Sequence, residues 1–498
     1  MNYVHQTPTE ECPLTKERQG CSLSDCCGFR SIICSFISLT GLITTTLILQ
    51  LVYDNNAFQG RLNIHGAVAT DYINCSQIGT KILIKGGNAV DAAIASMLCM
   101  TVVAPHKASL GSGGYIIIYN HGYKEKPKVI DFLNNTTSAE FDELHVRIPA
   151  MLRGLEYTHT MYGKLQWQDV VEPSIILARE GFEVSRDFAY ETTRNVNLGL
   201  FRHINAGEIL ALPKLANTLE LVSKFGTNVF YNGSISNEIF LNKTNERLLN
   251  DLSSYEPKVI TVQKSSLSQY AIYYPSNFNF LRSIIEEMNM LNISKENASS
   301  IDSEIIVAES IIKLALRLKN PYVNYTQSRK FTGVSSIDWQ DTYVSIITGL
   351  SSPLNLAYNT GAGFVFDNID NIDNTNSLLS LIPIIFFDEA TVCGLRGVFS
   401  TDDSIIAGQI LYNLLLRSMN VSTAVEYPRY YVLSDGIAIE NDDRHSGNRL
   451  LHDSLMAIAS MSKVDPNMIT KSVNVIIKRK NLINGHSDSR GDGLASRF

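Results

Sequence analysis

The stretch that decides the fold is Gly86-Gly87-Asn88-Ala89-Val90-Asp91-Ala92-Ala93-Ile94-Ala95, which is followed by Pro105-His106 and then by Gly111-Ser112-Gly113-Gly114-Tyr115. The first Gly-Gly pair predicts a turn, because glycine adopts backbone conformations that other residues avoid. The alanine-rich run after it predicts a helix. The second glycine-rich turn leads into an apolar strand over residues 115–119. Taken alone, the pattern indicates a helix that packs closely on a sheet.

The composition is that of a globular, mildly acidic protein. The chain has 498 residues, of which 45% are hydrophobic, and a formal net charge of −7 at pH 7. A chain of this length can bury one large core or two. Nothing in it is basic enough to form a nucleic-acid-binding surface, so we expect no nucleic-acid partner. No His or Cys cluster has the spacing of metal ligands, and we expect neither a metal nor another cofactor.

An uncharged, largely apolar run, SIICSFISLTGLITTTLILQLVY, occupies residues 31–53. A helix of this length spans a hydrocarbon core of about 30 Å. A buried helix or a cleaved signal peptide explains it less well, because the run is long, starts late and lacks a clear small-x-small cleavage site. More basic residues precede the run than follow it closely, which places the N-terminus in the cytosol. The sequence therefore predicts a cytoplasmic tail (1–30), a single-pass type II anchor (31–53) and an extracellular or luminal part (54–498).

Asn-x-Ser/Thr sequons agree with this topology, since all of them follow the apolar run. Such sequons mark surface positions of secreted chains, so we expect a glycoprotein. The candidate glycosylation sites are Asn74, Asn134, Asn135, Asn232, Asn242, Asn292, Asn297, Asn324 and Asn420.

The opening stretch, together with motifs in the same order along the chain, resembles the γ-glutamyltransferase family, also called γ-glutamyl transpeptidase or glutathione hydrolase. The matching motifs include Ala67–Asp71, Leu212–Ala216, Ala424–Arg429 and the tail Ser487–Gly493. The resemblance implies an α+β fold, the αββα sandwich of the N-terminal-nucleophile hydrolases, with two stacked sheets between helical layers. It also implies a disulfide between Cys75 and Cys99, because animal members of the family carry one with that placement. An oxidising compartment permits such a bond.

Members of this family cut themselves before a threonine, whose new N-terminal amine then activates its own hydroxyl to attack a γ-glutamyl carbonyl, such as that of glutathione. The family motif is Thr-Thr/Ala/Ser-His-x-Ser-Val-Val, and the resemblance aligns it with Asp341-Thr342-Tyr343-Val344-Ser345-Ile346-Ile347. In this register Asp341 takes the nucleophile position and divides a large-subunit-like region (54–340) from a small-subunit-like one (341–498). Thr342 is the substitute to consider, although a one-residue shift along a strand turns a side chain to the opposite face.

The positions that hold the substrate in the family also differ. The family's clamping arginine follows a V-I-N-A run, whereas here Val-Ile-Asp-Phe is followed by Leu133. A guanidinium suits the α-carboxylate of a γ-glutamyl group because the two can form paired hydrogen bonds. The residues that hold the α-amino group fall on a segment in which Asn368 matches, and a one-residue slip would supply Asp370 or Asp373. The paired serines of the family correspond to a segment that retains Ser380.

The Gly-Gly pair that binds the oxyanion in the family should lie near Gly397–Ser400, where no Gly-Gly is present. Loss of one oxyanion donor typically lowers the rate about 100- to 1000-fold. Together with the changes at the nucleophile and the clamp, this predicts a membrane-anchored pseudoenzyme that binds a small γ-glutamyl ligand or a protein partner. The alternative is an active glutathione hydrolase that cleaves the γ-glutamyl amide through Thr342 as an N-terminal nucleophile.

Overall fold

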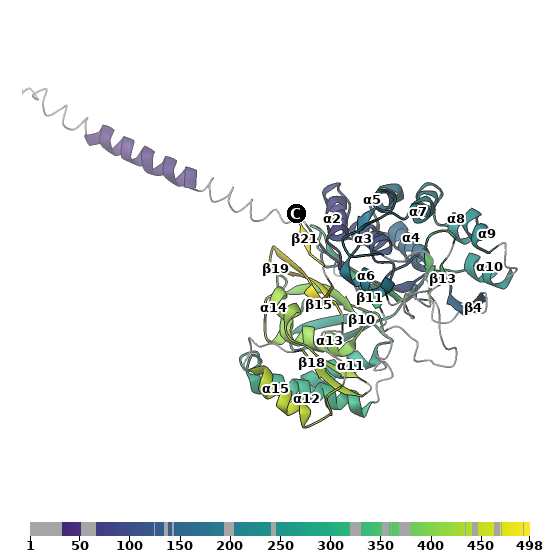
Figure 1. Ribbon diagram of the computed structural model, residues 1–498. Coiled ribbons are helices and arrows are strands. Elements are labelled where there is room, and N and C mark those ends of the chain that lie inside the picture. Colours follow the sequence, from purple (N-terminus) through teal and green to yellow (C-terminus); the bar gives the residue numbers. More distant parts are fainter. Residues whose placement is uncertain are drawn as a thin grey trace, which may run out of the picture. The chain divides into compact units, whose positions relative to one another are not determined.

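The computed structural model (Figure 1) describes two units of the chain, residues 1–63 and 64–498. The described residues are 32–50, 66–123, 125–133, 138–141, 144–193, 204–240, 246–318, 330–350, 358–359, 361–367, 380–433, 435–440, 447–462, 469, 471–491 and 493–498. The first unit contains a helix over Ile32–Gln50, whose 19 residues and mean hydropathy of 2.1 make it long and apolar enough to cross a membrane. A signal sequence has the same properties, so the expected type II orientation stays a prediction.

The larger sheet of the second unit has seven strands in the order β21-β1-β11-β12-β2-β3-β8. Every neighbouring pair in it is antiparallel. The bounds are β21 Ser496–Arg497, β1 Ala67–Ala69, β11 Lys330–Ile337, β12 Thr342–Leu350, β2 Gly113–Asn120, β3 Lys128–Asp131 and β8 Lys258–Ile260. The strand expected over residues 115–119 is therefore the middle of β2.

The smaller sheet has six antiparallel strands in the order β20-β19-β16-β15-β10-β9. Its strands are β20 Leu482–Ser487, β19 Asn474–Arg479, β16 Arg396–Thr401, β15 Ile382–Asp388, β10 Tyr270–Pro275 and β9 Val262–Leu267. Four two-stranded ribbons complete the described strands: β4 Ser138–Phe141 with β5 Leu144–Arg147, β6 Phe182–Glu183 with β7 Ile209–Leu210, β13 Tyr358–Asn359 with β14 Val365–Phe366, and β17 Tyr430–Leu433 with β18 Gly436–Ile439.

The helices form two groups with strands between them (Figure 1). The first group is α2 Ile73–Ile84, α3 Ala89–Val103, α4 Met151–Tyr162, α5 Trp167–Glu180, α6 Arg186–Thr193, α7 Pro213–Phe225, α8 Asn228–Tyr231, α9 Ser234–Phe240 and α10 Glu246–Ser253. The second is α11 Asn279–Met290, α12 Ile301–Arg317, α13 Ser404–Leu411 with its π-helical extension Tyr412–Leu416, α14 Val421–Glu426 and α15 Gly447–Met456.

Helix α3 is the alanine-rich helix that the sequence predicts, and all of its residues are buried. The Asn88 side chain accepts hydrogen bonds from the backbone N–H groups of Val90 and Asp91, and the Asp91 carboxylate accepts one from the Asn88 N–H. This reciprocal capping box satisfies backbone donors that the first turn of a helix leaves unpaired. Because its side chains are small, α3 contacts α2, α5 and strands β11 and β12.

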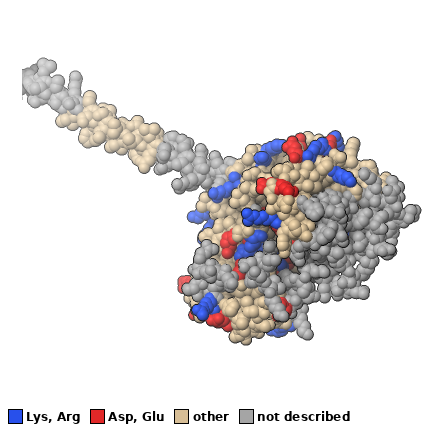
Figure 2. All heavy atoms as spheres, in the orientation of Figure 1, with Lys and Arg blue, Asp and Glu red and all other residues tan. Residues whose placement is uncertain are grey.

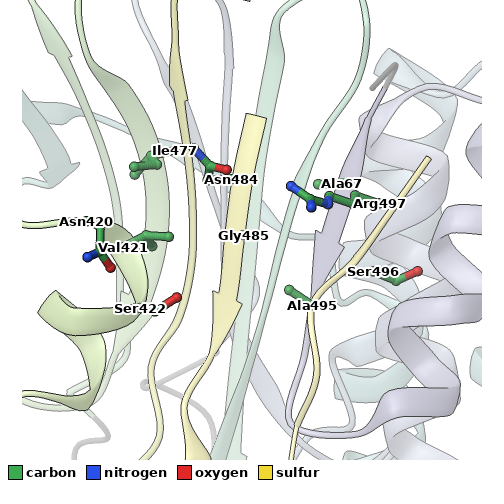
Figure 3. Close-up of a pocket in the computed structure, with 10 residues that line it drawn as sticks. All are labelled: Ala67, Asn420, Val421, Ser422, Ile477, Asn484, Gly485, Ala495, Ser496 and Arg497. Atoms are coloured by element: carbon green, nitrogen blue, oxygen red, sulfur yellow. The ribbon is translucent and has the colours of Figure 1, made fainter. Parts of the chain in front are cut away.

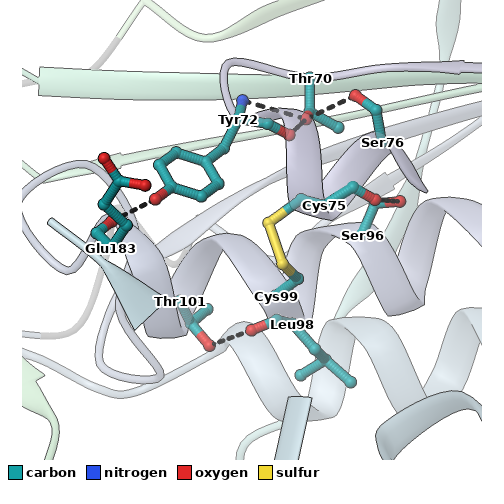
Figure 4. Close-up of a disulfide and its surroundings, with 9 residues drawn as sticks. All are labelled: Thr70, Tyr72, Cys75, Ser76, Ser96, Leu98, Cys99, Thr101 and Glu183. Carbon is teal, nitrogen blue, oxygen red and sulfur yellow. Dashed lines mark hydrogen bonds between the residues drawn. A yellow bond between two sulfur atoms is a disulfide. The ribbon is translucent and has the colours of Figure 1, made fainter. Parts of the chain in front are cut away.

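The expected disulfide is present and joins α2 to α3 (Figure 4). The Sγ atoms of Cys75 and Cys99 lie 2.03 Å apart, 24 residues apart in sequence. Beside it, the Ser96 hydroxyl donates a hydrogen bond of 2.9 Å to the carbonyl oxygen of Cys75. The two helices that carry the signature stretch are thus linked covalently and by hydrogen bonding.

Alternate side chains of β2 enter different hydrophobic cores. Tyr115 and Ile117 lie in a core shared with the six-stranded sheet and with helices α11–α14. Ile116 and Ile118 lie in a second core with the first group of helices. Because successive strand residues point to opposite faces, a strand buried on both sides reads as a continuous apolar run. The expectation of a mixed α+β fold is confirmed.

Candidate functional site

Asp341, the position aligned with the family nucleophile, lies in a tight turn between β11 and β12. Asp341 N–H donates to the Asp338 carbonyl at 3.2 Å, and Asp338 N–H donates to the Thr342 carbonyl at 3.3 Å. Asp341 has φ = 65°, in the left-handed region. This matches the common three-residue hairpin connection, whose last residue adopts a left-handed conformation that glycine favours. The turn therefore requires a residue at position 341 that tolerates a left-handed backbone conformation.

The Asp341 carboxylate is held by three side chains. It contacts Arg396 Nη2 at 2.5 Å and Lys478 Nζ at 2.9 Å, and it accepts a hydrogen bond from the Tyr343 hydroxyl at 2.9 Å. Burial favours a higher pKa for Asp341, but the hydrogen bonds and charges of Arg396 and Lys478 outweigh it, so the pKa lies below its usual value. Burial and the neighbouring carboxylate raise the pKa of Tyr343 well above its usual range. Asp341 is thus an ion-paired carboxylate that links the two sheets.

Thr342, the possible substitute nucleophile, is almost fully buried, with 8% of its surface exposed. Its hydroxyl accepts a hydrogen bond from the Asn120 amide at 2.9 Å. Its backbone N–H donates to the Asp338 carboxylate at 3.0 Å. The alternative function would need a Thr342 hydroxyl beside a free amine, whereas in this hairpin the hydroxyl and the backbone N–H both have hydrogen-bond partners.

Leu133, at the clamp position, lies at the opposite end of the seven-stranded sheet. Its Cα lies close to Gly113, since a Cβ placed on that glycine would be only 2.7 Å away. Gly113 pairs with Gly349, whereas Asn120 at the other end of β2 pairs with Thr342. Seven steps along an antiparallel strand amount to about 24 Å. A γ-glutamyl group is far shorter, so Leu133 and Asp341 cannot line one substrate pocket, and the joint placement expected from the sequence is corrected.

Strand β11 starts at the Leu133 end, which we call the pocket end; the end that carries Asp341 is the turn end. Phe331 pairs with Gly349, and Thr332 pairs with Thr348. The segment Phe331-Thr332-Gly333-Val334-Ser335-Ser336-Ile337 also fits the family motif, with Thr, Ser and Ile at three of its positions. The alignment that starts at Asp341 agrees with the family motif at one more position than the alignment that starts at Phe331. The sequence alone therefore favours Asp341. Only the strand pairing shows which segment begins beside Leu133.

In this second register the nucleophile position is Phe331. Phe331 is 5% exposed and Leu133 is 1% exposed, and both belong to the core between the two sheets. Phe278 and Leu381 lie in the same core. Phe278 also meets the Tyr115 ring edge-on, with ring centroids 5.9 Å apart. Apolar side chains therefore occupy the pocket end at the two positions that carry a hydroxyl and a guanidinium in the family motif.

The neighbours of Phe331 on β11 depart from the motif as well. Thr332 points to the other face, where its hydroxyl donates to the buried Asp71 carboxylate at 2.8 Å. Gly333 takes the histidine position and faces Ser400 of β16. A Cβ placed on Gly333 would lie 2.2 Å from the Ser400 hydroxyl oxygen, closer than real Cβ contacts come. A side chain at position 333 therefore requires at least that the Ser400 hydroxyl rotate away.

Two carboxylates follow β16 at the pocket end. Gly397–Ser400, where sequence comparison sought a Gly-Gly pair, lie within β16 itself. Beyond the strand, Lys471 Nζ lies 3.2 Å from Asp402 and 3.6 Å from Asp403. The Asp403 side chain also caps α13 by accepting the Ile405 N–H at 2.7 Å. The lysine and the first turn of α13 are thus engaged by these two carboxylates at the place where the family has its oxyanion donors.

The remaining predicted site positions are divided between the described and the undescribed residues. Ser380 is buried and lies two residues before Ile382, the first residue of β15, which pairs with Thr401, so it lies at the pocket end. Asn368 and Asp370 lie outside the described residues. The described segment before them ends at Asp367, which is buried in an ion pair with Arg147 (Nε–Oδ2 3.0 Å). The structure thus brings Leu133 and Ser380 to one end, and Asp341 and Thr342 to the other.

The sequons show different degrees of exposure. Asn232, Asn292, Asn297 and Asn420 are exposed, whereas Asn74 is half-buried. Asn134, Asn135, Asn242 and Asn324 lie outside the described residues. Glycosylation at all nine stays a prediction.

A separate cavity of about 460 Å³ lies between the edge strands of the two sheets (Figure 3). Its lining includes Ala67 of β1, Asn484 of β20, Arg497 of β21 and the start of α14. The lining contains hydroxyl and amide side chains but no carboxylate, histidine or cysteine that would serve as a base or nucleophile. On the face shown in Figure 2, acidic and basic side chains are interspersed. Within the part of the chain that the structure describes, no group of three or more His, Cys, Asp or Glu side chains is placed to hold a metal ion.

Comparison with known proteins identifies relatives. The gamma-glutamyltranspeptidase family model matches residues 75–337, which is 263 of the 498 residues. The match includes Phe331–Ile337 and ends before Asp341. Glutathione hydrolase 7 of Homo sapiens is 31% identical over 229 residues, which cover 41% of this chain and 34% of that protein. Scoloptoxin SSD14 of Scolopendra dehaani is 27% identical over 305 residues, which cover 54% of this chain and 52% of that protein.

A third relative, the glutathione hydrolase 5 proenzyme of Rattus norvegicus, is 27% identical over 339 residues, which cover 59% of each chain. The matches thus span between about a third and three fifths of these relatives. Among solved structures, a cephalosporin acylase from Bacillus halodurans superposes with a TM-score of 0.71 and 17% identity, over 87% of this chain and 96% of that one. That likeness concerns the fold alone.

Proposed function

Because the chain belongs to the gamma-glutamyltranspeptidase family, we propose that it is a membrane-anchored member that neither cleaves itself nor transfers γ-glutamyl groups. The observation that carries this proposal is the pair of buried apolar side chains, Phe331 and Leu133, at the pocket end. Phenylalanine has no hydroxyl to attack a peptide or γ-glutamyl carbonyl. Leucine has no donor for the substrate α-carboxylate. In the proposed alignment, nucleophilic attack lacks its hydroxyl and substrate binding lacks its guanidinium donor.

The proposal places the large- and small-subunit-like boundary before Phe331 rather than at Asp341. Three observations support this boundary: β11 starts beside Leu133, Ser380 lies at the same end, and the family match extends to Ile337. With this boundary, the two sheets and their two groups of helices correspond to the αββα sandwich of the N-terminal-nucleophile hydrolases.

The side chains at the pocket end also help to decide whether the chain binds a small γ-glutamyl ligand or a protein. A small γ-glutamyl ligand carries a carboxylate and an ammonium group, and both need polar partners when they leave water. At the clamp position such a ligand would meet the apolar side chain of Leu133, and near the end of β16 it would find Lys471 already paired with Asp402 and Asp403. A protein partner bound elsewhere on the surface therefore fits this chain better than a γ-glutamyl ligand does.

One observation favours an active glutathione hydrolase instead. Thr332 is the hydroxyl next to the proposed boundary, and it donates to the Asp71 carboxylate at 2.8 Å, the arrangement of a nucleophile beside a base. Against this, Asp71 also accepts hydrogen bonds from Ser472 at 2.8 Å and from Asn474 at 2.6 Å, as a structural carboxylate does. Thr332 is also completely buried, on the sheet face away from Leu133.

The experiment that tests the proposal is N-terminal sequencing of the full-length chain, expressed in animal cells, deglycosylated and separated by denaturing electrophoresis. The same preparation is assayed for release of a chromophore from a γ-glutamyl anilide, beside an active family member. We expect one intact band and no release. A new N-terminus at Thr332 or Thr342 that disappears in the corresponding threonine-to-valine variant would establish self-cleavage and overturn the proposal.

A further inference from the structure

The turn end exposes large apolar side chains from four separate turns. Tyr123, in the connection between β2 and β3, is 78% exposed, and Trp339, in the β11–β12 hairpin, is 62% exposed. Val392, between β15 and β16, is 72% exposed, and Leu482, at the start of β20, is 56% exposed. We call these four side chains, with the exposed Arg479 and Lys480 beside Leu482, the turn surface.

The four turns that carry these side chains are linked to one another by hydrogen bonds and one ion pair. His121 N–H donates to the Asp341 carbonyl at 3.0 Å, and the His121 ring contacts the Val392 carbonyl at 3.3 Å. Lys480 N–H donates to the Cys393 carbonyl at 3.1 Å, and Lys478 pairs with Asp341 at 2.9 Å. Because each turn closes a paired β-ladder, the exposed side chains stand on rigid supports.

The composition of the turn surface is that of a membrane interface. Tryptophan and tyrosine concentrate at the headgroup level of bilayers, where an apolar ring and a polar edge are both accommodated. Basic side chains beside them are attracted to anionic headgroups. Arg479 and Lys480 are exposed, and the carboxylate of Asp341 behind them is paired with Arg396 and Lys478. The exposed carboxylates of the same turns, Glu125 and Glu389, are paired with Lys128 and Lys264. Scattered exposed apolar residues need no explanation, but a joined group of them marks an interaction site.

The path of the chain leads to the same end. The described part of the second unit begins at Gly66, next to Ala67, which pairs with Ile337 just before the hairpin. The Phe498 N–H donates to the Gly66 carbonyl at 3.2 Å. Residues 51–65 connect Gly66 to the apolar helix Ile32–Gln50 and can reach at most about 50 Å. The chain therefore enters this unit at the end that carries the turn surface.

We propose that the turn surface rests on the lipid headgroups of the membrane that anchors the chain, with Trp339 and Tyr123 at the interface. The inference rests on the membrane anchor of the proposed function, and it is independent of whether the chain is catalytic. It gives the turn end a role that neither the family motif nor the pocket end supplies.

The two tryptophans of the chain, Trp167 and Trp339, allow a direct test. The full-length Trp167→Phe variant, in which Trp339 is the remaining tryptophan, is reconstituted into phosphatidylcholine–phosphatidylserine vesicles with or without bromine near the headgroup end of the acyl chains. At headgroup level we expect brominated lipid to quench Trp339 fluorescence roughly twofold. The Trp339→Phe variant reports Trp167, which is half-buried against His159 and donates its indole N–H to the Val222 carbonyl, and it should be quenched much less than Trp339. Charge reversal at Arg479 and Lys480 should weaken the quenching of Trp339.

The outcomes separate this inference from the anchor on which it rests. Extraction at alkaline pH shows first whether the chain is retained in the bilayer; loss of the chain would refute the anchor and, with it, this inference. A retained chain whose Trp339 is unquenched by brominated lipid and accessible to aqueous iodide would refute the docking surface alone. Protection from iodide without quenching by brominated lipid would mean that a protein, such as a second copy, covers Trp339, which also overturns the proposal.

Discussion

The two ends of the seven-stranded sheet differ in the kind of side chain that they hold. The pocket end keeps the framework of the family, with Leu133, Phe331 and Ser380 brought together, but the first two of these side chains are apolar and buried. The turn end holds an ion-paired carboxylate, Asp341, and a buried threonine, Thr342, which resemble catalytic groups in sequence. Asp341 and Thr342 therefore have structural contacts in the turn. Leu133 and Phe331, at the positions that the second register aligns with reactive groups, pack in the core between the sheets.

The comparison shows that a motif has to be placed on a sheet before it is interpreted. Two consecutive antiparallel strands, β11 and β12, carry nearly equivalent matches to one motif. They run in opposite directions, so their first residues lie at opposite ends of the sheet. About 24 Å of strand separates the two interpretations, and only one of them lies beside the clamp position.

The largest effect is expected at the pocket end, from Phe331→Thr. This change restores the hydroxyl of the family motif but leaves a cavity in the core between the sheets, and truncation of a buried phenylalanine costs about 3–5 kcal/mol. We expect a large drop in the free energy of unfolding, measured by urea denaturation, and no self-cleavage. The matched control is Phe225→Thr, at a position 67% exposed, which should change stability little. Cleavage before residue 331 in the variant would mean that the pocket end is still competent.

The next effect is expected at the turn end, from Asp341→Asn. Asparagine tolerates the left-handed backbone of this turn, so the change isolates the charge. Removal of one partner from a largely buried ion pair leaves Arg396 and Lys478 uncompensated, which should cost about 2–4 kcal/mol in thermal or chemical unfolding. Asp453→Asn, on the exposed side of α15, is the control. An unchanged midpoint would show that Asp341 does not hold the sheets together.

A smaller effect is expected from acid. Burial favours higher pKa values for Asp341 and Glu426, but the partners of each outweigh it: Arg396 and Lys478 keep the pKa of Asp341 below its usual value, and His486 and Ser489 lower that of Glu426 to about 2. A carboxyl group whose folded-state pKa is depressed stabilises the fold above its unfolded pKa, and this contribution is lost as pH falls through the folded pKa. Stability should therefore decline below about pH 4.5, and the decline should be shallower in an Asp341→Asn/Glu426→Gln variant. If the free energy of unfolding fell equally steeply with pH in both proteins, these ion pairs would not account for the acid sensitivity.

The smallest effect is expected from Thr342→Val. This near-isosteric change removes one hydrogen bond, to Asn120, and should cost about 1 kcal/mol. The chain should remain a single band on denaturing gels, as before the change. If the unmodified chain were cut and this variant were not, Thr342 would be the nucleophile and the assignment of the two ends would be reversed.

Much of the fold could be predicted from sequence because it depends on local patterns. The run Ala89–Ala95 has the small side chains and the capping residues of a buried helix, and residues 115–119 have the apolar continuity of a strand covered on both faces. The family resemblance supplied the disulfide, which the structure contains. These features need no knowledge of which strands are neighbours.

The candidate site could be predicted only in part, because it depends on strand pairing. The sequence assigns Leu133 and Ser380 from the family motifs that their segments resemble, and these assignments stay predictions. The nucleophile position had two matches, and choosing between them requires the register in which Phe331 pairs with Gly349. The turn surface could not be predicted at all, since Trp339 and Val392 are isolated apolar residues in sequence and their turns are brought to one end only by the stacking of the two sheets.

The close approach of Gly333 to Ser400 limits which side chains position 333 can accept. Any side chain on Gly333 would meet the Ser400 hydroxyl oxygen within 2.2 Å of its Cβ. A histidine at position 333 would therefore have to displace the Ser400 hydroxyl, and a threonine at position 331 would open a cavity in the core. Under the proposed function, the packed core between the sheets would by itself oppose the single substitutions that restore the family motif, because they disturb its packing.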